Sequence, residues 1–144
     1  MKILVLDEDY RQYLALLFAV DVMADAGSDP GAFSGEYDVL LAQPNLAARY
    51  LQRGNSVSWI QSTWAGIDGL LPAVQSSNTV VTGIKDIFGP QMAEYVFAFL
   101  LQKTRALPNF REQQSKGIWS PRAPGSLVGQ TMLVLGTGTI GAHI

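Results

Sequence analysis

The chain has 144 residues, of which 48% are hydrophobic and 15% charged, a balance typical of a folded globular protein with a buried core. Its net charge is −2 and it has no run of Lys or Arg, which argues against binding to nucleic acid or to an anionic membrane. Without cysteine, disulfides, thiolate metal sites and cysteine nucleophiles are excluded, and a cytoplasmic location is expected. The N-terminus lacks the plan of a signal peptide, and no apolar run is long enough to span a bilayer.

Short apolar runs alternate with helical segments through the first half of the chain. The runs predict strands at residues 3–6, 21–24, 39–42, 57–61 and 79–82, and the segments between them predict helices at 10–18, 44–53 and 66–75. This alternation implies an α/β protein with a parallel sheet and helices on both faces. Ligands of such sheets bind at the carboxyl ends of the strands.

The second half begins with a long predicted helix. Gly89 and Pro90 start it, and it is expected to run to about Leu107, where Pro108 interrupts it before a second helix over 109–119. Apolar residues of the stretch 91–101 nearly encircle the helix, which indicates that a partner subunit or another domain covers part of it. The alternative is a helix with one face on the core and modest exposure elsewhere.

A glycine motif lies near the end of the chain. The apolar run 132–135 predicts a buried strand, and Gly136, Gly138 and Gly141 follow it with G-x-G-x-x-G spacing. The first glycine permits a tight turn, the second lets backbone approach a pyrophosphate, and the third lets a helix pack closely on the strand. Glycines also close ordinary strand–helix turns, so the motif alone is weak evidence. His143, just beyond it, is interpreted as an ordinary helix residue.

Three acids, Asp7, Glu8 and Asp9, follow the first predicted strand. One interpretation is an acidic metal pocket of the kind found in phospho-receiver domains. Such a domain also needs an acceptor aspartate after the third strand, where this sequence has Ala42 and Gln43, and Lys85 after the fifth strand does not compensate for its absence. The favoured interpretation is that Asp7 or Asp9 caps the first helix. No metal site is predicted.

The stretch Ser62–Asp68 follows the fourth predicted strand and is expected to open a helix. The backbone amides of Ala65 and Gly66 would then face a small carboxylate, because a helix N-terminus binds anions. The alternative is a plain strand–helix turn with Asp68 as an acid of the first helical turn. The residues by themselves leave both interpretations open.

Taken together, these features resemble the NAD(P)-dependent D-isomer-specific 2-hydroxyacid dehydrogenases. The resemblance covers nearly the whole chain and is most specific from Trp59 onward. The variant forms around Trp64 and in the glycine turn are similar to the glyoxylate/hydroxypyruvate reductase branch. The family pattern is met by Ser62, Ala65, Gly66 and Asp68, by the block Met92–Tyr95, by Trp119, Leu127, Gly129 and Thr131, and by the glycine motif.

The resemblance implies a flavodoxin-like substrate domain over residues 1–100, a crossover and dimerisation arm with linker over 101–125, and the first strand and turn of a Rossmann domain over 126–144. It implies a homodimer formed through the helical arm 89–119. The substrate carboxylate would bind at Trp64, Ala65 and Gly66. NAD or NADP would bind at Gly136, Gly138, Thr139, Ile140 and Gly141.

The reaction implied is hydride transfer between the nicotinamide and a 2-keto or 2-hydroxy acid, with an Arg binding the substrate and a His, tuned by a Glu, moving the proton. In the family these three residues follow the region matched here, so no catalytic residue is assigned in this chain. We therefore expect the chain to be the front part of a longer protein and to be inactive alone. Two alternatives are a non-catalytic dimeric interaction module and a phospho-receiver-like domain.

Overall fold

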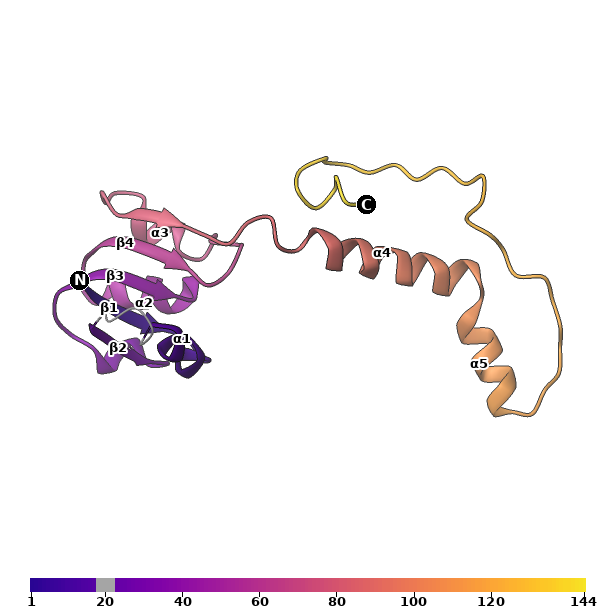
Figure 1. The fold of residues 1–144 in the computed structure, drawn as a ribbon, viewed down its shortest axis with the longest axis horizontal. Helices are drawn as coiled ribbons and strands as arrows, with labels where there is room; N and C mark the ends of the chain where they lie inside the picture. The colour runs from indigo at the N-terminus through magenta and orange to yellow at the C-terminus, as the bar shows by residue number, and fades with distance from the viewer. Residues whose placement is uncertain (18–22) are drawn as a thin grey trace. The chain divides into compact units, whose positions relative to one another are not determined.

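The computed structural model describes residues 1–17 and 23–144, which form two compact units, Met1–Ile84 and Lys85–Ile144 (Figure 1). The end of the first predicted helix, at residue 18, and the start of the second predicted strand, at 21 and 22, lie outside the described residues. The predicted division of the chain at residues 100 and 125 stays a prediction.

The first unit contains a five-stranded, all-parallel sheet in the order β2-β1-β3-β4-β5. This confirms the predicted α/β class and the flavodoxin-like strand order. The described part of β2 extends to Gly27, beyond the predicted limit, because each of its residues pairs with a residue of β1 although its own sequence is only weakly apolar. The strands are β1 (Lys2–Leu6), β2 (Met23–Gly27), β3 (Tyr37–Ala42), β4 (Val57–Ser62) and β5 (Val80–Thr82).

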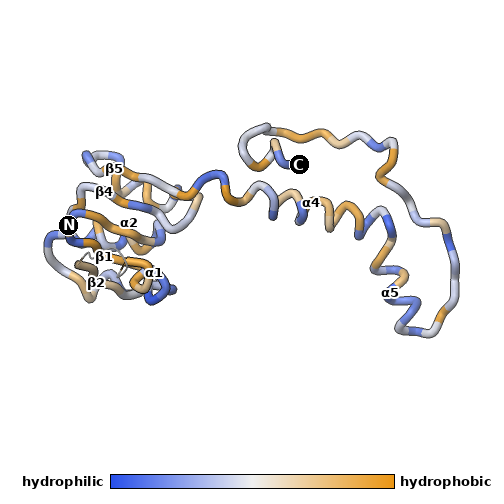
Figure 2. The backbone as a smooth tube through the Cα atoms, viewed as in Figure 1, coloured by the Kyte–Doolittle hydropathy of each residue, from blue (hydrophilic) through white to orange (hydrophobic). Residues whose placement is uncertain are grey.

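Helices cover both faces of this sheet: α1 (Tyr10–Leu17) on one and α2 (Pro44–Gln52) on the other. Successive residues of β1 divide between the faces, as a strand requires. Ile3 and Val5 pack with Tyr13, whereas Leu4 and Leu6 pack with the cluster that includes α2. Because both faces of the sheet are covered, residues 3–6 of β1 and 39–42 of β3 are apolar without interruption, and β1 is coloured as hydrophobic in Figure 2. A short 3-10 turn, η2 (Pro30–Ala32), lies between β2 and β3.

The helix predicted over residues 66–75 is wrong in extent: the structure has only α3 (Leu71–Val74), preceded by bends and a turn. Pro72 gives the physical reason. In the predicted helix it would stand in the interior, where it has no N–H to donate to the preceding turn. The helix therefore starts late enough to place Pro72 in its first turn. Residues 63–70 become a loop, anchored at its two ends by the buried Thr63 and Leu70.

The second unit begins with α4 (Gly89–Thr104), which ends before the predicted limit, and α5 (Leu107–Ser115) follows it. The break falls at Arg105 and Ala106 instead of at Pro108, because proline fits the first turn of a helix, where its missing N–H would have no partner within the helix. Ala106 takes the left-handed conformation, with φ 53°. No helix of the described residues is long and apolar enough to cross a membrane.

The prediction that the second helix continues to residue 119 is also wrong. Gly117 has φ +65°, and its amide donates to the carbonyl of Gln114 at 3.1 Å. The amide of Ile118 donates to the carbonyl of Gln113 at 2.9 Å. These two bonds form a Schellman cap, which needs a left-handed residue and which glycine adopts without steric cost. The helix ends there, and Trp119 is 90% exposed.

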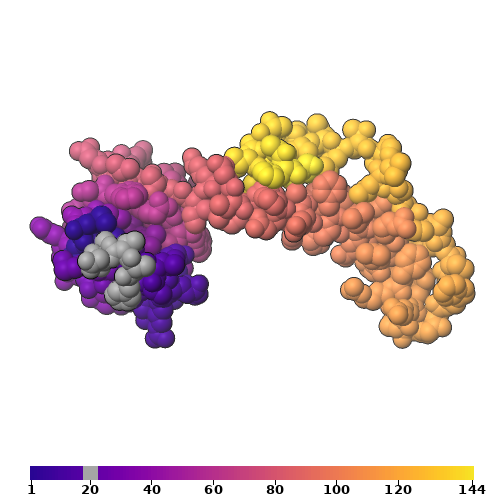
Figure 3. Space-filling view, viewed as in Figure 1, coloured from indigo at the N-terminus to yellow at the C-terminus, as the bar shows by residue number. Residues whose placement is uncertain are grey.

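The predicted strand at Met132–Leu135 is not formed, and no residue of the fully described range 85–144 is in a strand. A strand needs a neighbour to take its hydrogen bonds, and this unit supplies none. Instead the segment lies beside α4 (Figures 1 and 3). Arg105 donates to the carbonyl of Gly125 at 3.1 Å. The two segments share a hollow lined by Phe97, Leu100, Lys103, Thr104, Gly125, Ser126, Leu127, Gln130, Thr131 and Met132.

Candidate functional site

Three polar residues stand directly after β1, β3 and β4, at the carboxyl edge of the sheet: Asp7, Gln43 and Thr63. Asp7 is only 3% exposed. One of its carboxylate oxygens accepts a hydrogen bond from the Thr63 hydroxyl at 2.7 Å, and the other accepts one from Gln43 Nε2 at 3.2 Å. The buried carboxylate of Asp7 therefore joins the ends of these strands.

Asp7 also accepts a hydrogen bond from the backbone amide of Asp9 at 2.9 Å, just before α1 begins. The Asp9 amide belongs to the turn before α1 and not to the helix itself, so this bond is an Asx-turn, and the interpretation that Asp7 or Asp9 caps the helix stays a prediction. Among residues 1–17 and 23–144 no three His, Cys, Asp or Glu side chains gather in a way that would hold a metal ion. Ala42 is fully buried where a receiver domain needs its acceptor aspartate.

Tyr13 of α1 faces the same edge of the sheet. Burial raises the pKa of its phenol, and the negative charges of Asp7 and Asp9 raise it further, while a hydrogen bond with Thr63 acts in the opposite direction. The phenol is therefore neutral at physiological pH. It adds a polar but uncharged group beside the Asp7 carboxylate.

The loop that follows β4 carries the predicted substrate-binding residues. The buried Ser62 fixes its start, because its hydroxyl accepts the Trp64 amide at 3.0 Å and donates to the Trp64 carbonyl at 2.7 Å. Ala65 and Gly66 are exposed, and neither amide donates a hydrogen bond to any part of the chain that the structure describes. The loop thus offers two unpaired N–H groups, which are suited to a small anion.

The expectation that a helix dipole strengthens this site is wrong. α3 starts only at Leu71 and has 4 residues, so the amides of Ala65 and Gly66 belong to a loop and not to a helix N-terminus. Asp68 lies in a turn that leads into α3, which the amides of Leu70 and Leu71 close by donating to the Ile67 carbonyl at 2.9 Å and 3.2 Å. A Cβ atom added at Gly66 would lie 4.0 Å from the Asp68 carboxylate, which lowers the positive potential of the loop. Hydrogen bonds alone would hold an anion there.

Side chains of β4 and β5 support the loop from the sheet, and the sequence did not reveal them. Trp59 Nε1 donates to the Thr82 hydroxyl at 2.7 Å, and that hydroxyl donates to Gln61 at 2.6 Å. Gln61 Nε2 in turn donates to the Ser62 carbonyl at 2.9 Å. In the sequence, this network is indicated by a polar residue near the end of each of two apolar strands, Gln61 and Thr82. Next to them, a Cβ atom at Gly83 would lie 3.5 Å from the Trp64 carbonyl, so the loop rests on the end of β5.

The glycine turn holds the predicted cofactor-binding residues, and each of its glycines has a different environment. Gly136 has φ +94°, which makes the tight turn. A Cβ atom at Gly141 would collide with the Gly136 carbonyl, whereas one at Gly138 would meet no atom within 4 Å. A single helical turn follows, with the Ala142 amide donating to the Gly138 carbonyl at 2.9 Å. The tight turn expected at Gly136 is formed. The roles of Gly138 beside a pyrophosphate and of Gly141 in packing a helix on a strand stay predictions, because no strand precedes the motif here.

His143 is occupied within its own unit. Its Nδ1 lies 2.7 Å from the Thr139 carbonyl oxygen, so this nitrogen carries the proton and donates to it. The ring also packs against the backbone of Gly89, the first residue of α4. His143 is expected in a helix, and the structure places it in a turn, where these contacts hold it.

Solved structures provide the most extensive similarity. The chain is 38% identical to a D-isomer-specific 2-hydroxyacid dehydrogenase family protein from Aeromonas salmonicida, with a TM-score of 0.88 over 99% of this chain and 48% of that one. It is 22% identical to an NADPH-dependent glyoxylate/hydroxypyruvate reductase from Sinorhizobium meliloti, solved with NADP and malonate. There the TM-score is 0.73, over 99% of this chain and 48% of that one, a likeness of fold.

Among curated proteins, an uncharacterised protein of the mprR 3′ region in Streptomyces coelicolor is 29% identical over 118 residues, which are 82% of this chain and 41% of that protein. No family model matches the chain. The chain therefore spans less than half the length of these relatives.

Proposed function

Since the chain matches the N-terminal portion of D-isomer-specific 2-hydroxyacid dehydrogenases in structure, we propose that it is the substrate-binding part of an NAD(P)-dependent oxidoreductase of this kind. The observation that carries the proposal is 38% identity to the Aeromonas protein over 99% of the chain. The reaction is reversible hydride transfer between a nicotinamide and the keto or hydroxyl carbon of a 2-keto or D-2-hydroxy acid. Glyoxylate and hydroxypyruvate are the first substrates to test.

The substrate carboxylate binds at the loop after β4, to the unpaired amides of Ala65 and Gly66, with the Trp64 indole beside them. Trp64 is 50% exposed while its backbone is held by Ser62, so the indole is available to a ligand. Supporting this proposal, the Sinorhizobium reductase was solved with malonate, which is itself a small carboxylate. In the complete enzyme the family's Arg would supply the positive charge that this loop lacks.

The cofactor is NAD or NADP, and its pyrophosphate lies at Gly136, Gly138, Thr139, Ile140 and Gly141. The residues present fit this group, because the space around Gly138 is open to a close approach and Gly141 lets the following turn pack tightly. The NADP in the Sinorhizobium reductase supports the assignment. When bound, the cofactor supplies the hydride, and these residues of the chain only hold its phosphates.

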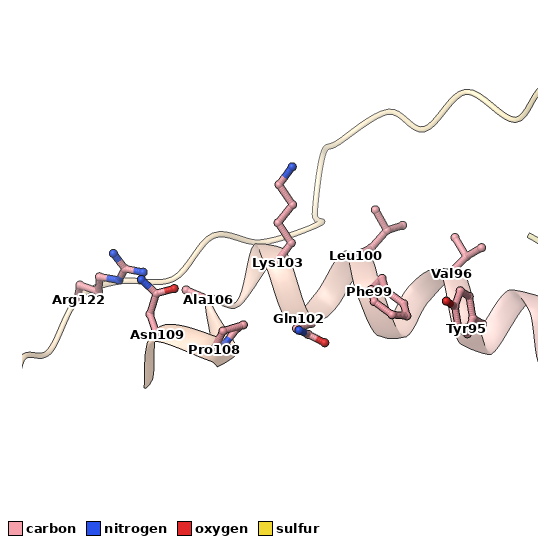
Figure 4. A pocket seen from close by; sticks show the side chains of 10 residues that line it. All are labelled: Tyr95, Val96, Phe99, Leu100, Gln102, Lys103, Ala106, Pro108, Asn109 and Arg122. Carbon is pink, nitrogen blue, oxygen red and sulfur yellow. The ribbon is translucent and has the colours of Figure 1, made fainter. Parts of the chain in front are cut away.

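The enzyme is a homodimer that uses the helical arm of residues 89–119. α4 leaves large apolar side chains exposed on several sides, among them Tyr95 at 60% and Phe99 at 55%. An apolar groove runs along the end of α4 onto α5, as Figure 4 shows. Within the complete enzyme we retain the division into residues 1–100, 101–125 and 126–144, and the cytoplasmic location, as predictions.

Residues 1–144 alone are proposed to be inactive. The family's proton-transferring His is not matched in this sequence, whose single histidine, His143, already donates to Thr139. A second candidate function follows from the same observation together with the exposed α4: a non-catalytic module that dimerises. Dimerisation of the gene product without turnover would favour that module over the dehydrogenase.

The test is an assay of the protein as its gene encodes it, with NADH or NADPH and a panel of 2-keto acids. Gly66→Pro removes one of the two amide donors, and Gly66→Ala is the matched control, since an added Cβ meets only the Asp68 carboxylate at 4.0 Å. We expect Gly66→Pro to raise KM for the keto acid about tenfold, the loss of one hydrogen bond to a charged group. Equal KM values in the two variants would contradict the assignment of this loop.

A further inference from the structure

We propose that Asp7 and Thr63 are positioning residues for the carboxylate-binding loop: their buried hydrogen bond fixes the start of the loop and thereby the direction of the Ala65 and Gly66 amides. The inference rests on the proposed function of that loop. It assigns a role to an acid and a hydroxyl that do not themselves touch the substrate.

The geometry of the loop shows why its start needs an anchor. The amides of Ala65 and Gly66 make no hydrogen bond to any described residue, so they depend on the residues before and after them. After them, the Ile67 carbonyl accepts the amide of Leu70 at 2.9 Å. Before them, the hydroxyl of Ser62, at the end of β4, holds the backbone of Trp64. Thr63 is tied to the sheet through its amide to the Ala42 carbonyl at 3.0 Å and through its hydroxyl to Asp7.

The bond from Thr63 to Asp7 is well suited to this task. It is 2.7 Å long, it joins residues 56 apart in sequence, and both partners are buried, Thr63 at 8% exposure. Hydrogen bonds to an ionised acceptor are stronger than neutral ones, and burial excludes competing water. The bond therefore selects a single orientation of the Thr63 side chain and of the backbone that leaves it.

Asp7 is itself held in place. Its second oxygen accepts from Gln43 Nε2 and from the Asp9 amide, so the carboxylate cannot turn away from Thr63 without breaking other bonds. The hydrogen bonds of Asp7 to Gln43 and Thr63 thus link the ends of β1, β3 and β4. A loop fixed in this way binds an anion without first losing conformational freedom, which is the energetic benefit of preorganisation.

The experiment uses the 144-residue chain, with malonate as the probe, and follows the backbone amide signals of Ala65 and Gly66 by NMR. Thr63→Val removes the hydroxyl at nearly constant shape, and Thr63→Ser restores it. Asp7→Asn is a second test from the other side of the bond. Asp9→Asn removes an exposed neighbouring charge whose side chain makes no hydrogen bond to the described residues, and it serves as the control.

We expect Thr63→Val to weaken malonate binding about tenfold and to increase the fast motion of the Ala65 and Gly66 amides, with Thr63→Ser and Asp9→Asn close to the parent. If the bond between Thr63 and Asp7 only stabilised the fold, Thr63→Val would lower the unfolding temperature. The malonate affinity of the folded protein and the motion of the two amides would then stay unchanged. That result would overturn the inference.

The two proposals fail in different ways. If the parent chain binds malonate at these amides and Thr63→Val binds it equally well, the positioning role is overturned while the function of the loop stands. If the parent does not bind malonate but the loop amides become mobile in Thr63→Val and Asp7→Asn, the positioning role is supported and the proposed carboxylate site fails. An Asp7→Asn chain that does not fold leaves the Thr63 pair to decide.

Discussion

The two compact units of this chain use their apolar residues in opposite ways. In residues 1–84 the sheet buries large side chains on both faces, and Leu4, Leu40 and Ile60 are completely inaccessible. In residues 85–144, all of which are described, Gly89 alone is buried. Both units contain strongly apolar segments, as Figure 2 shows, so composition does not explain the difference.

The difference lies in where the partners of these side chains are. The first unit finds them within its own sequence, because parallel strands and their connecting helices form a closed core. The second unit presents Tyr95, Phe99 and Leu101 on a helix that its own residues cover only in part. Exposed apolar surface of this extent marks a region that other protein covers. The first unit is therefore built around its own core, whereas the second leaves apolar side chains exposed, as the proposed dimer arm requires.

The largest expected effect is on the free energy of unfolding. It compares the same substitution, leucine to alanine, in each of the two units. Leu40→Ala in the first unit should lower the free energy of unfolding by about 2–5 kcal/mol, because it leaves a cavity among completely buried side chains. Leu101→Ala on α4, where the side chain is 43% exposed, should change it by less than about 0.5 kcal/mol. Urea unfolding of dilute protein, followed by circular dichroism, measures both.

Equal losses in the two variants would contradict the division. If Leu101→Ala becomes costly only as the protein concentration rises, the helix is covered by a second copy, and the comparison is sharpened instead.

The next largest expected effect is on the association of two copies of the chain through α4. Tyr95 and Phe99 lie one helical turn apart with ring centroids 4.8 Å from each other, and both are more than half exposed. Replacing both by Ser should weaken dimerisation by about 2 kcal/mol or more, as expected for central aromatic residues of an interface. Sedimentation over a range of concentrations measures this.

Leu16→Ser, on α1 of the first unit and 71% exposed in the parent, is the control. A parent chain that stays monomeric at all concentrations would count against the arm as a dimer interface.

The contrast between the two units also explains which elements of the fold could be predicted from the sequence and which could not. The parallel sheet and α2 follow from local patterns, because in the first unit the residues that set the pattern are also those that pack. The flavodoxin-like strand order came from the family resemblance. The predicted extent of α3 is wrong because Pro72 cannot stand in the interior of that helix. The strand predicted at 132–135 is not formed because a strand needs a neighbouring strand, which the local sequence does not supply.

The site shows the same limit. The loop at Ala65 and Gly66 was located from the position after a strand and from the family pattern. The bond between Asp7 and Thr63 was not predicted, because it joins the ends of β1 and β4, which only the folded sheet brings together. Polar residues placed singly at the ends of neighbouring strands, such as Gln43 and Thr82, are the available signal, and they are individually too common to interpret.

A smaller effect of alkaline pH should be confined to the first unit. Burial, together with the hydrogen bond to Asp25 and its charge, raises the pKa of Tyr37, and burial raises that of Tyr50. A pKa raised on folding contributes stability that is complete below the ordinary tyrosine value of about 10 and is lost as the pH rises above it. The free energy of unfolding should therefore fall above about pH 10.

Tyrosinate absorbance and urea unfolding at successive pH values measure this dependence. Tyr37→Phe should reduce its slope, because one group that binds a proton more tightly in the folded state has been removed. A slope unchanged in Tyr37→Phe would place the alkaline loss elsewhere in the chain.

The smallest effect concerns how the second unit holds its structure without a core. Gly117 closes α5 with φ +65°, a backbone conformation that costs a residue with a Cβ atom about 1 kcal/mol or more. Gly117→Ala should therefore speed amide exchange at Ile118, whose bond to Gln113 forms the cap, and fray the last turn of α5. Gly138→Ala is the control, since a Cβ atom there meets no atom within 4 Å. In a unit with so little buried surface, one cap is a large share of the local stability. If Gly117→Ala left exchange at Ile118 unchanged, α5 would have to be held by packing, and the contrast between the two units would be smaller than the burial of their side chains indicates.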